Sequence, residues 1–87
     1  MPKFERQVAA RPAELAGMID SRLRKLGMSL TDSSTYGVGS AVAILKVWGC
    51  LTVLVIGSQQ LTTVTAISPS PEDASLLERI LEEIHGS

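Results

Sequence analysis

The sequence predicts an α+β fold, in which one antiparallel sheet carries two helices packed on the same face. Two apolar stripes at helical spacing predict the helices, and two β-rich runs joined at Gly49-Cys50 predict the centre of the sheet. The chain has 87 residues, of which 45% are hydrophobic and 20% charged, a composition typical of globular proteins. We therefore expect residues 1–87 to form a single α+β domain with a modest core.

Apolar residues that recur every three or four positions mark the two helices. The first is predicted from Pro12 to Leu26, with Gly27 as the residue that ends it, and its stripe comprises Leu15, Ile19, Leu23 and Leu26. The second begins at Ser70-Pro71-Glu72-Asp73, which combines an N-cap serine, a proline at the first helical position and an acidic residue at the third. Its stripe comprises Leu76, Leu77, Ile80, Leu81 and Ile84, and Gly86 is expected to end it.

Residues 41–57, AVAILKVWGCLTVLVIG, predict a tight β-hairpin. Glycine at the first central position of a two-residue turn is typical of a type II′ turn, which sets Trp48 opposite Leu51. Alternation with a period of two then defines two faces. The Lys46 face comprises Val42, Ile44, Lys46, Trp48, Leu51, Val53 and Val55. The Leu45 face comprises Ala41, Ala43, Leu45, Val47, Thr52, Leu54 and Ile56.

Three further segments complete an expected order of β-α-β-β-β-β-α. Leu61 to Ile67 predicts a strand after the hairpin, and Phe4 to Val8 predicts a short first strand. The polar segment from Met28 to Tyr36 fits either an edge strand or an irregular crossing segment, and Gly37 and Gly39 then turn the chain. The order is similar to the TATA-binding-protein-like (TBP-like) and helix-grip-like topologies. The similarity concerns topology alone, so it implies no function or site.

The Lys46 face is predicted to point away from the helices, because burial of an unpaired ammonium group is costly. The Leu45 face would then pack beneath them. An exposed apolar patch on a soluble protein marks an interaction site, and a twofold dimer is the simplest way to cover it. The seven residues of the Lys46 face are therefore the candidate interface or ligand face.

The composition argues against several kinds of function. A formal net charge of −1 is not that of a broad nucleic-acid binder, and one cysteine allows neither an intrachain disulfide nor a cysteine-based zinc site. The first residues, MPKFERQVAARP, contain no apolar signal segment. The apolar stretch from Val38 to Ile56 is interrupted by Lys46 and Gly49, which disfavours a membrane span. We expect a cytoplasmic protein that binds neither nucleic acid nor membranes.

Charge is divided unevenly between the two ends of the chain. Residues 1–27 hold six basic and three acidic residues, whereas residues 70–87 hold one basic and five acidic residues. The pattern is more consistent with a basic first helix that lies beside an acidic second helix than with a basic surface that binds an anionic partner. Arg22 lies inside the first apolar stripe, where its stem is expected to cover apolar surface; the alternative is that it anchors an anionic ligand.

No catalytic, cofactor or metal site is predicted. Residues 36–40, YGVGS, contain two glycines of a phosphate-binding pattern, but Val42 stands where the third glycine is needed. Cys50 has no histidine or cation beside it in the sequence to activate a thiolate. His85 is the one histidine and lies in the last turn of the second predicted helix, where capping or a surface position is favoured over catalysis.

The expected function is that of a small non-enzymatic interaction module, which self-associates through the apolar sheet face that points away from its helices. A homodimer is favoured over a higher oligomer. The alternative is a binding protein for a small apolar ligand, held on the sheet or between the helices and the sheet. No cofactor is expected in either case.

Overall fold

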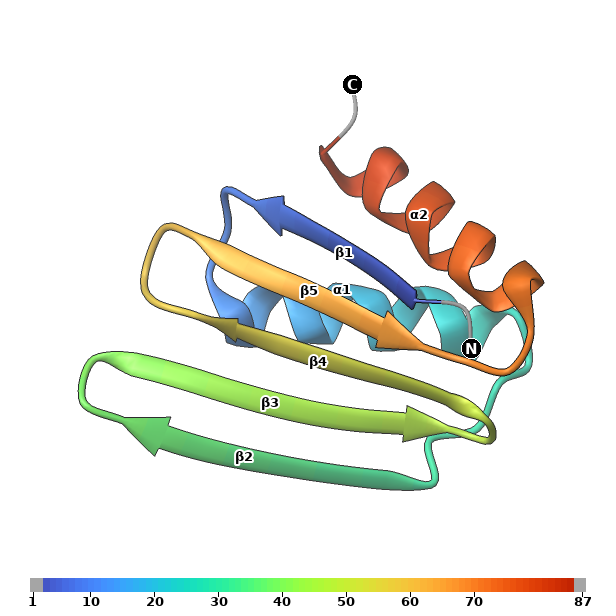
Figure 1. The fold of residues 1–87 in the computed structure, drawn as a ribbon, viewed down its shortest axis with the longest axis horizontal. Coiled ribbons are helices and arrows are strands. Elements are labelled where there is room, and N and C mark those ends of the chain that lie inside the picture. The colour runs from blue at the N-terminus through green and yellow to red at the C-terminus, as the bar shows by residue number, and fades with distance from the viewer. Residues whose placement is uncertain (1–2, 86–87) are drawn as a thin grey trace.

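The structure, a computed structural model, describes residues 3–85, which form five strands and two helices in the order β-α-β-β-β-β-α. The elements are β1 (Lys3–Val8), α1 (Pro12–Lys25), β2 (Asp32–Val38), β3 (Ala41–Trp48), β4 (Leu51–Gly57), β5 (Thr62–Ile67) and α2 (Pro71–His85). All neighbouring strands are antiparallel, in the sheet order β1-β5-β4-β3-β2 (Figure 1). The predicted fold class and element order are confirmed, and the polar segment before Gly39 forms an edge strand.

Two tight hairpins build the β2-β3-β4 part of the sheet. Gly39 and Gly49 each have a φ of 61°, and each is the first central residue of a two-residue turn. Within residues 3–85, positive φ occurs only at glycine, so Ser40 and Cys50 have negative φ. This combination of φ values is the one that a type II′ turn requires, as predicted for Gly49-Cys50.

The end of α1 and the start of α2 have the hydrogen bonds that the sequence pattern indicates, whereas Arg11 at the start of α1 makes no side-chain capping bond. At the end of α1, Met28 N donates to Leu23 O at 3.0 Å and Gly27 N donates to Arg24 O at 3.0 Å, with Gly27 at a φ of 84°. These bonds form a Schellman motif, which satisfies carbonyl groups that the helix leaves unpaired. At the start of α2, the Glu72 N–H donates to Ser70 Oγ at 3.3 Å. The predicted end of this helix at Gly86 lies outside the described residues.

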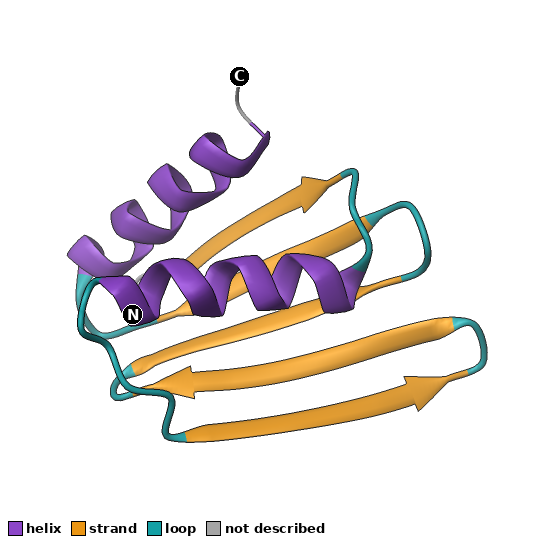
Figure 2. Ribbon diagram, turned by 180° about the vertical axis from the view of Figure 1, so that it is seen from behind, coloured by secondary structure: helices purple, strands orange, loops and turns teal. Residues whose placement is uncertain are grey.

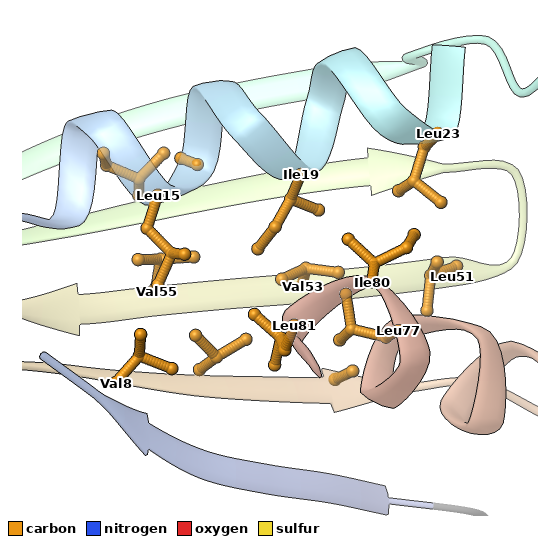
Figure 3. Close-up of a cluster of buried hydrophobic side chains, with 14 of the residues drawn as sticks. Val8, Leu15, Ile19, Leu23, Leu51, Val53, Val55, Leu77, Ile80 and Leu81 are labelled. Atoms are coloured by element: carbon orange, nitrogen blue, oxygen red, sulfur yellow. The ribbon is translucent and has the colours of Figure 1, made fainter. Parts of the chain in front are cut away.

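The two helices cover one face of the sheet, α1 over β3 and β4, and α2 over β1 and β5 (Figure 2). Side chains from both helices meet the sheet in a core of hydrophobic residues (Figure 3). The helices contribute Leu15, Ala16, Ile19, Leu23, Leu77, Ile80 and Leu81, and the sheet contributes Val8, Ile44, Trp48, Leu51, Val53, Val55, Val64 and Ala66. Each of these side chains is less than one tenth exposed.

The Lys46 face packs beneath the helices, so the prediction that it points away from them is wrong. Five of its seven residues are buried in the core and a sixth packs against it: Ile44, Trp48, Leu51, Val53, Val55 and Val42. Lys46 lies at the margin of this core beside Ala16 and Ile19, and its Nζ donates to Ser33 Oγ of β2 at 3.2 Å. Its stem therefore covers apolar surface while the ammonium group stays outside. Burial of this face does not require burial of the charge.

The uneven distribution of charge reflects contacts within the chain. Arg22 of α1 forms an ion pair with Glu83 of α2, and Arg6 of β1 pairs with Glu78 of α2 at 3.5 Å. The basic first part of the chain thus lies beside the acidic second helix, as predicted. Because Arg22 already contacts a carboxylate, the interpretation of this residue as an anchor for an anionic ligand loses its support.

Candidate functional site

The sheet surface that carries no described helix is the candidate functional site, and we call it the outer face. It consists of the Leu45 face of the β3-β4 hairpin, continued onto the other three strands by the strand register. Its side chains form three rows that run from β1 to β2. The first row is Lys3, Ile67, Thr52, Val47 and Asp32. The second is Glu5, Thr65, Leu54, Leu45 and Ser34. The third is Gln7, Thr63, Ile56, Ala43 and Tyr36.

The outer face has an apolar centre and polar edges. Ile56 is 44% exposed and Ile67 is 40% exposed, while Leu54, Leu45 and Val47 are half-buried by their neighbours in the sheet. The strand at one edge contributes Lys3, Glu5 and Gln7, and the strand at the other contributes Asp32, Ser34 and the 59% exposed Tyr36. An apolar centre surrounded by a polar rim is the usual anatomy of a protein interface.

The outer face has the area of a small specific interface. Five strands about 4.8 Å apart, each with six residues at about 3.3 Å, span roughly 24 Å by 20 Å, or about 480 Å². Two such faces in contact would bury about 1,000 Å², which is close to the lower limit for a specific complex. Figure 1 views the sheet from this side, with α1 behind it.

The interior offers no comparable site. Within the described chain, the space between α1 and the sheet around Lys46 and Trp48 has no room for a water molecule. A shallow depression of about 290 Å³ lies between the helices, lined by Met18, Ser21, Arg22, Glu83 and Ile84. A second one, of about 400 Å³, lies on α2. Both are open and shallow, and the Arg22–Glu83 ion pair occupies the wall of the first.

The polar side chains considered as catalytic or metal-binding candidates are not brought together. Cys50 is exposed in the β3-β4 turn, and Asp20 accepts hydrogen bonds from Trp48 Nε1 at 3.2 Å and from Arg24 at 2.7 Å. Residues 3–85 contain no cluster of three or more side chains suited to a metal ion. The side chain of His85 lies outside what the structure describes. Neither described helix is long and apolar enough to cross a membrane.

Once β5 is paired with the hairpin, its residues indicate the correct orientation. Register pairing of Gly57 with Thr62 aligns Val64 with Val55 and Ala66 with Val53, so the Lys46 face continues into β5 as an apolar surface. The Leu45 face instead continues into β5 as Thr63 and Thr65. The face with apolar residues on three strands is the better candidate for the core. This continuity is stronger evidence for burial of the face than Lys46 is against it.

Comparison with models of protein families, with curated proteins and with solved structures finds no match for this chain.

Proposed function

We propose that the protein is a non-enzymatic interaction module that binds a second copy of itself through the outer face of its sheet. One observation carries this proposal: the apolar centre of the outer face, around Ile56, Ile67 and Leu54, stays accessible while both helices pack on the opposite face. The largest contiguous apolar patch on a protein surface often has a binding function.

A second copy suits this surface better than a small ligand. Ligand sites are concave and enclose most of the ligand, whereas the outer face is one side of an open five-stranded sheet. A sheet packs well on another sheet about 10 Å away, with the apolar side chains of both faces between them. In a twofold dimer, the central strand β4 of each copy lies on that of the other, so apolar surface meets apolar surface.

The expected association is reversible. A total buried area of about 1,000 Å² lies at the small end for specific complexes, so the expected dimer dissociates on dilution.

The substitution Ile56→Asp tests the proposal. Ile56 lies on the central strand and is 44% exposed, so the variant is expected to fold. It would place a carboxylate from each copy inside the interface, where desolvation and mutual repulsion disfavour association. We expect a monomer by sedimentation equilibrium at concentrations where the wild type is a dimer, with an unchanged circular dichroism spectrum.

Leu26→Asp is the matched control, because Leu26 is 59% exposed and follows α1 away from the outer face. This variant is expected to keep the mass of the wild type. A wild-type protein that remains monomeric at high concentration would refute the proposal, and so would a dimer that Ile56→Asp leaves intact.

A further inference from the structure

The charged residues of the outer face lie at its two edges and in two different rows. Lys3 and Asp32 stand at opposite ends of the first row, and Glu5 stands at the β1 end of the second. Neighbouring groups hold both carboxylates in place: Asp32 Oδ1 accepts from Ser33 N at 2.9 Å, and Glu5 Oε2 accepts from Thr65 Oγ1 at 3.4 Å. The pattern is asymmetric, so different twofold axes bring different charges together.

A twofold axis parallel to the central strand β4 exchanges the two edges of the sheet and keeps the rows. The sheet has two strands on either side of β4, so β1 of one copy then lies over β2 of the other. Lys3 lies over the partner's Asp32, and the symmetry repeats this contact at the opposite edge. Glu5 lies over the partner's Ser34, so every charged residue of the outer face meets an opposite charge or a neutral polar group.

A twofold axis that runs across the strands keeps the edges and exchanges the first and third rows. Lys3 then lies over the partner's Gln7, and Glu5 lies over the partner's Glu5. The two lysines lose their acidic partners and two carboxylates face each other at the edge of a low-dielectric interface. Like charges in this position disfavour an arrangement, which is how charge patterns select the orientation of a complex.

Apolar side chains support the first arrangement. With the axis along β4, Ile67 lies over the partner's Val47, and Ile56 lies over the partner's Ile56. With the axis across the strands, Ile56 lies over the partner's Thr52 instead. The first arrangement therefore pairs the two most exposed aliphatic side chains of the outer face with apolar partners.

We infer that two copies pack face to face about a twofold axis parallel to β4, with Lys3 of each copy paired with the partner's Asp32. This inference rests on the proposed self-association and adds the orientation and the residues that select it. Because the pairs lie at the rim, they influence the rate and specificity of association, and added salt weakens them.

Charge reversal tests the inference. Lys3→Glu alone and Asp32→Lys alone each turn two attractive contacts into two repulsive ones, and each is expected to raise the dimer Kd about tenfold or more at low salt. The double variant Lys3→Glu/Asp32→Lys restores both contacts with the charges exchanged. Its Kd is expected to return to within about threefold of the wild type. An equimolar mixture of the two single variants is expected to form heterodimers, because each contact then joins opposite charges.

Glu5→Gln is the control that separates the two axes. With the axis along β4 this substitution leaves the dimer Kd unchanged, whereas with the axis across the strands it strengthens the dimer by removing a Glu5–Glu5 contact. All of these positions are exposed, so circular dichroism should report the wild-type fold in each variant.

The outcomes distinguish this inference from the proposed function. If Ile56→Asp breaks the dimer but the double variant is no tighter than the single ones, the axis is wrong and the outer face remains the interface. A monomeric wild type overturns both. Rescue by the double variant, together with heterodimers in the mixture, supports the axis along β4.

Discussion

Trp48 and Lys46 lie on the buried face of β3, and each carries its polar atom past the core to a partner. The Trp48 indole donates to Asp20 Oδ1 at 3.2 Å, and Lys46 Nζ donates to Ser33 Oγ at 3.2 Å. Both side chains combine an apolar body with a polar tip, so burial of the body and hydration or pairing of the tip are compatible. The face of the strand on which a side chain lies therefore does not decide where its polar or charged group lies.

Gly57 is required by a close approach between the ends of β4 and β5. A Cβ at this position would overlap the Leu61 backbone oxygen and lie 2.6 Å from Thr62 Cα. Because backbone atoms cannot move aside as a flexible side chain can, Gly57→Ala is expected to lower the free energy of unfolding by about 1–3 kcal/mol. Urea denaturation followed by circular dichroism measures the change.

Gly17→Ala provides the matched comparison. Gly17 lies in α1, and a Cβ there would meet no heavy atom within 4 Å. Replacement of a helical glycine by alanine reduces the conformational entropy of the unfolded chain, so a gain of about 0.5–1 kcal/mol is expected. Equal urea midpoints for the two variants would contradict the close approach at Gly57.

At the scale of elements, the start of α2 uses more residues than a simple capping box. Ser70 Oγ accepts from the Glu72 N–H, but the Asp73 carboxylate accepts from Ser68 Oγ at 2.6 Å, and Ser68 Oγ in turn accepts from the Ser70 N–H at 3.1 Å. The buried Ser68 therefore stands between the two members of the predicted box. As in a capping box, backbone N–H groups at the start of the helix donate to side-chain oxygens.

Ser70→Ala is expected to lower the free energy of unfolding by about 0.5–2 kcal/mol, because the Glu72 N–H loses its acceptor. The exposed Ser75, inside the same helix, serves as the control, and Ser75→Ala is expected to change stability by less than about 0.5 kcal/mol. Thermal or urea unfolding measures both variants. A loss no larger for Ser70→Ala than for Ser75→Ala would mean that the side chain of Ser70 does not cap α2.

At the scale of the whole molecule, two helices cover one face of a five-stranded sheet, and β2 projects beyond the buried core. Within the described chain, the core draws its sheet residues from β1, β3, β4 and β5, whereas Ser33 and Thr35, on the helix side of β2, are exposed. The molecule thus has one core and one accessible sheet face. Its stability depends on the first, and its proposed association depends on the second.

A pair of matched substitutions compares these two faces. Ile44 is 6% exposed and belongs to the core, so Ile44→Asp buries a charge and is expected to unfold the protein. Ile56→Asp, on the opposite face of the same hairpin, is expected to fold and to lose only association. Circular dichroism and solution mass report both. A folded, monomeric Ile44→Asp variant would mean that the Lys46 face is exposed after all.

The sequence by itself determined the two helices and the central hairpin, but it left open whether the polar segment from Met28 to Tyr36 is a strand. Helical spacing of leucine and isoleucine marked α1 and α2 to within one residue at the described ends, and Gly49 marked the turn that sets Trp48 opposite Leu51. These features depend on local geometry, that is, on the period of a helix, the period of a strand and the φ values open to glycine. Each of these features can therefore be recognised from a short stretch of sequence.

Only the tertiary structure decided which face of the sheet meets the helices, and with it where the candidate interface lies. Alternation with a period of two defines two faces but does not show which of them packs against the helices. Both faces of this hairpin are largely apolar. The choice depends on the register with β5, which extends the Lys46 face with Val64 and Ala66, and on the reach of the Lys46 ammonium to Ser33. Both are contacts between paired strands, so the physical reason for the orientation exists only once the sheet has formed.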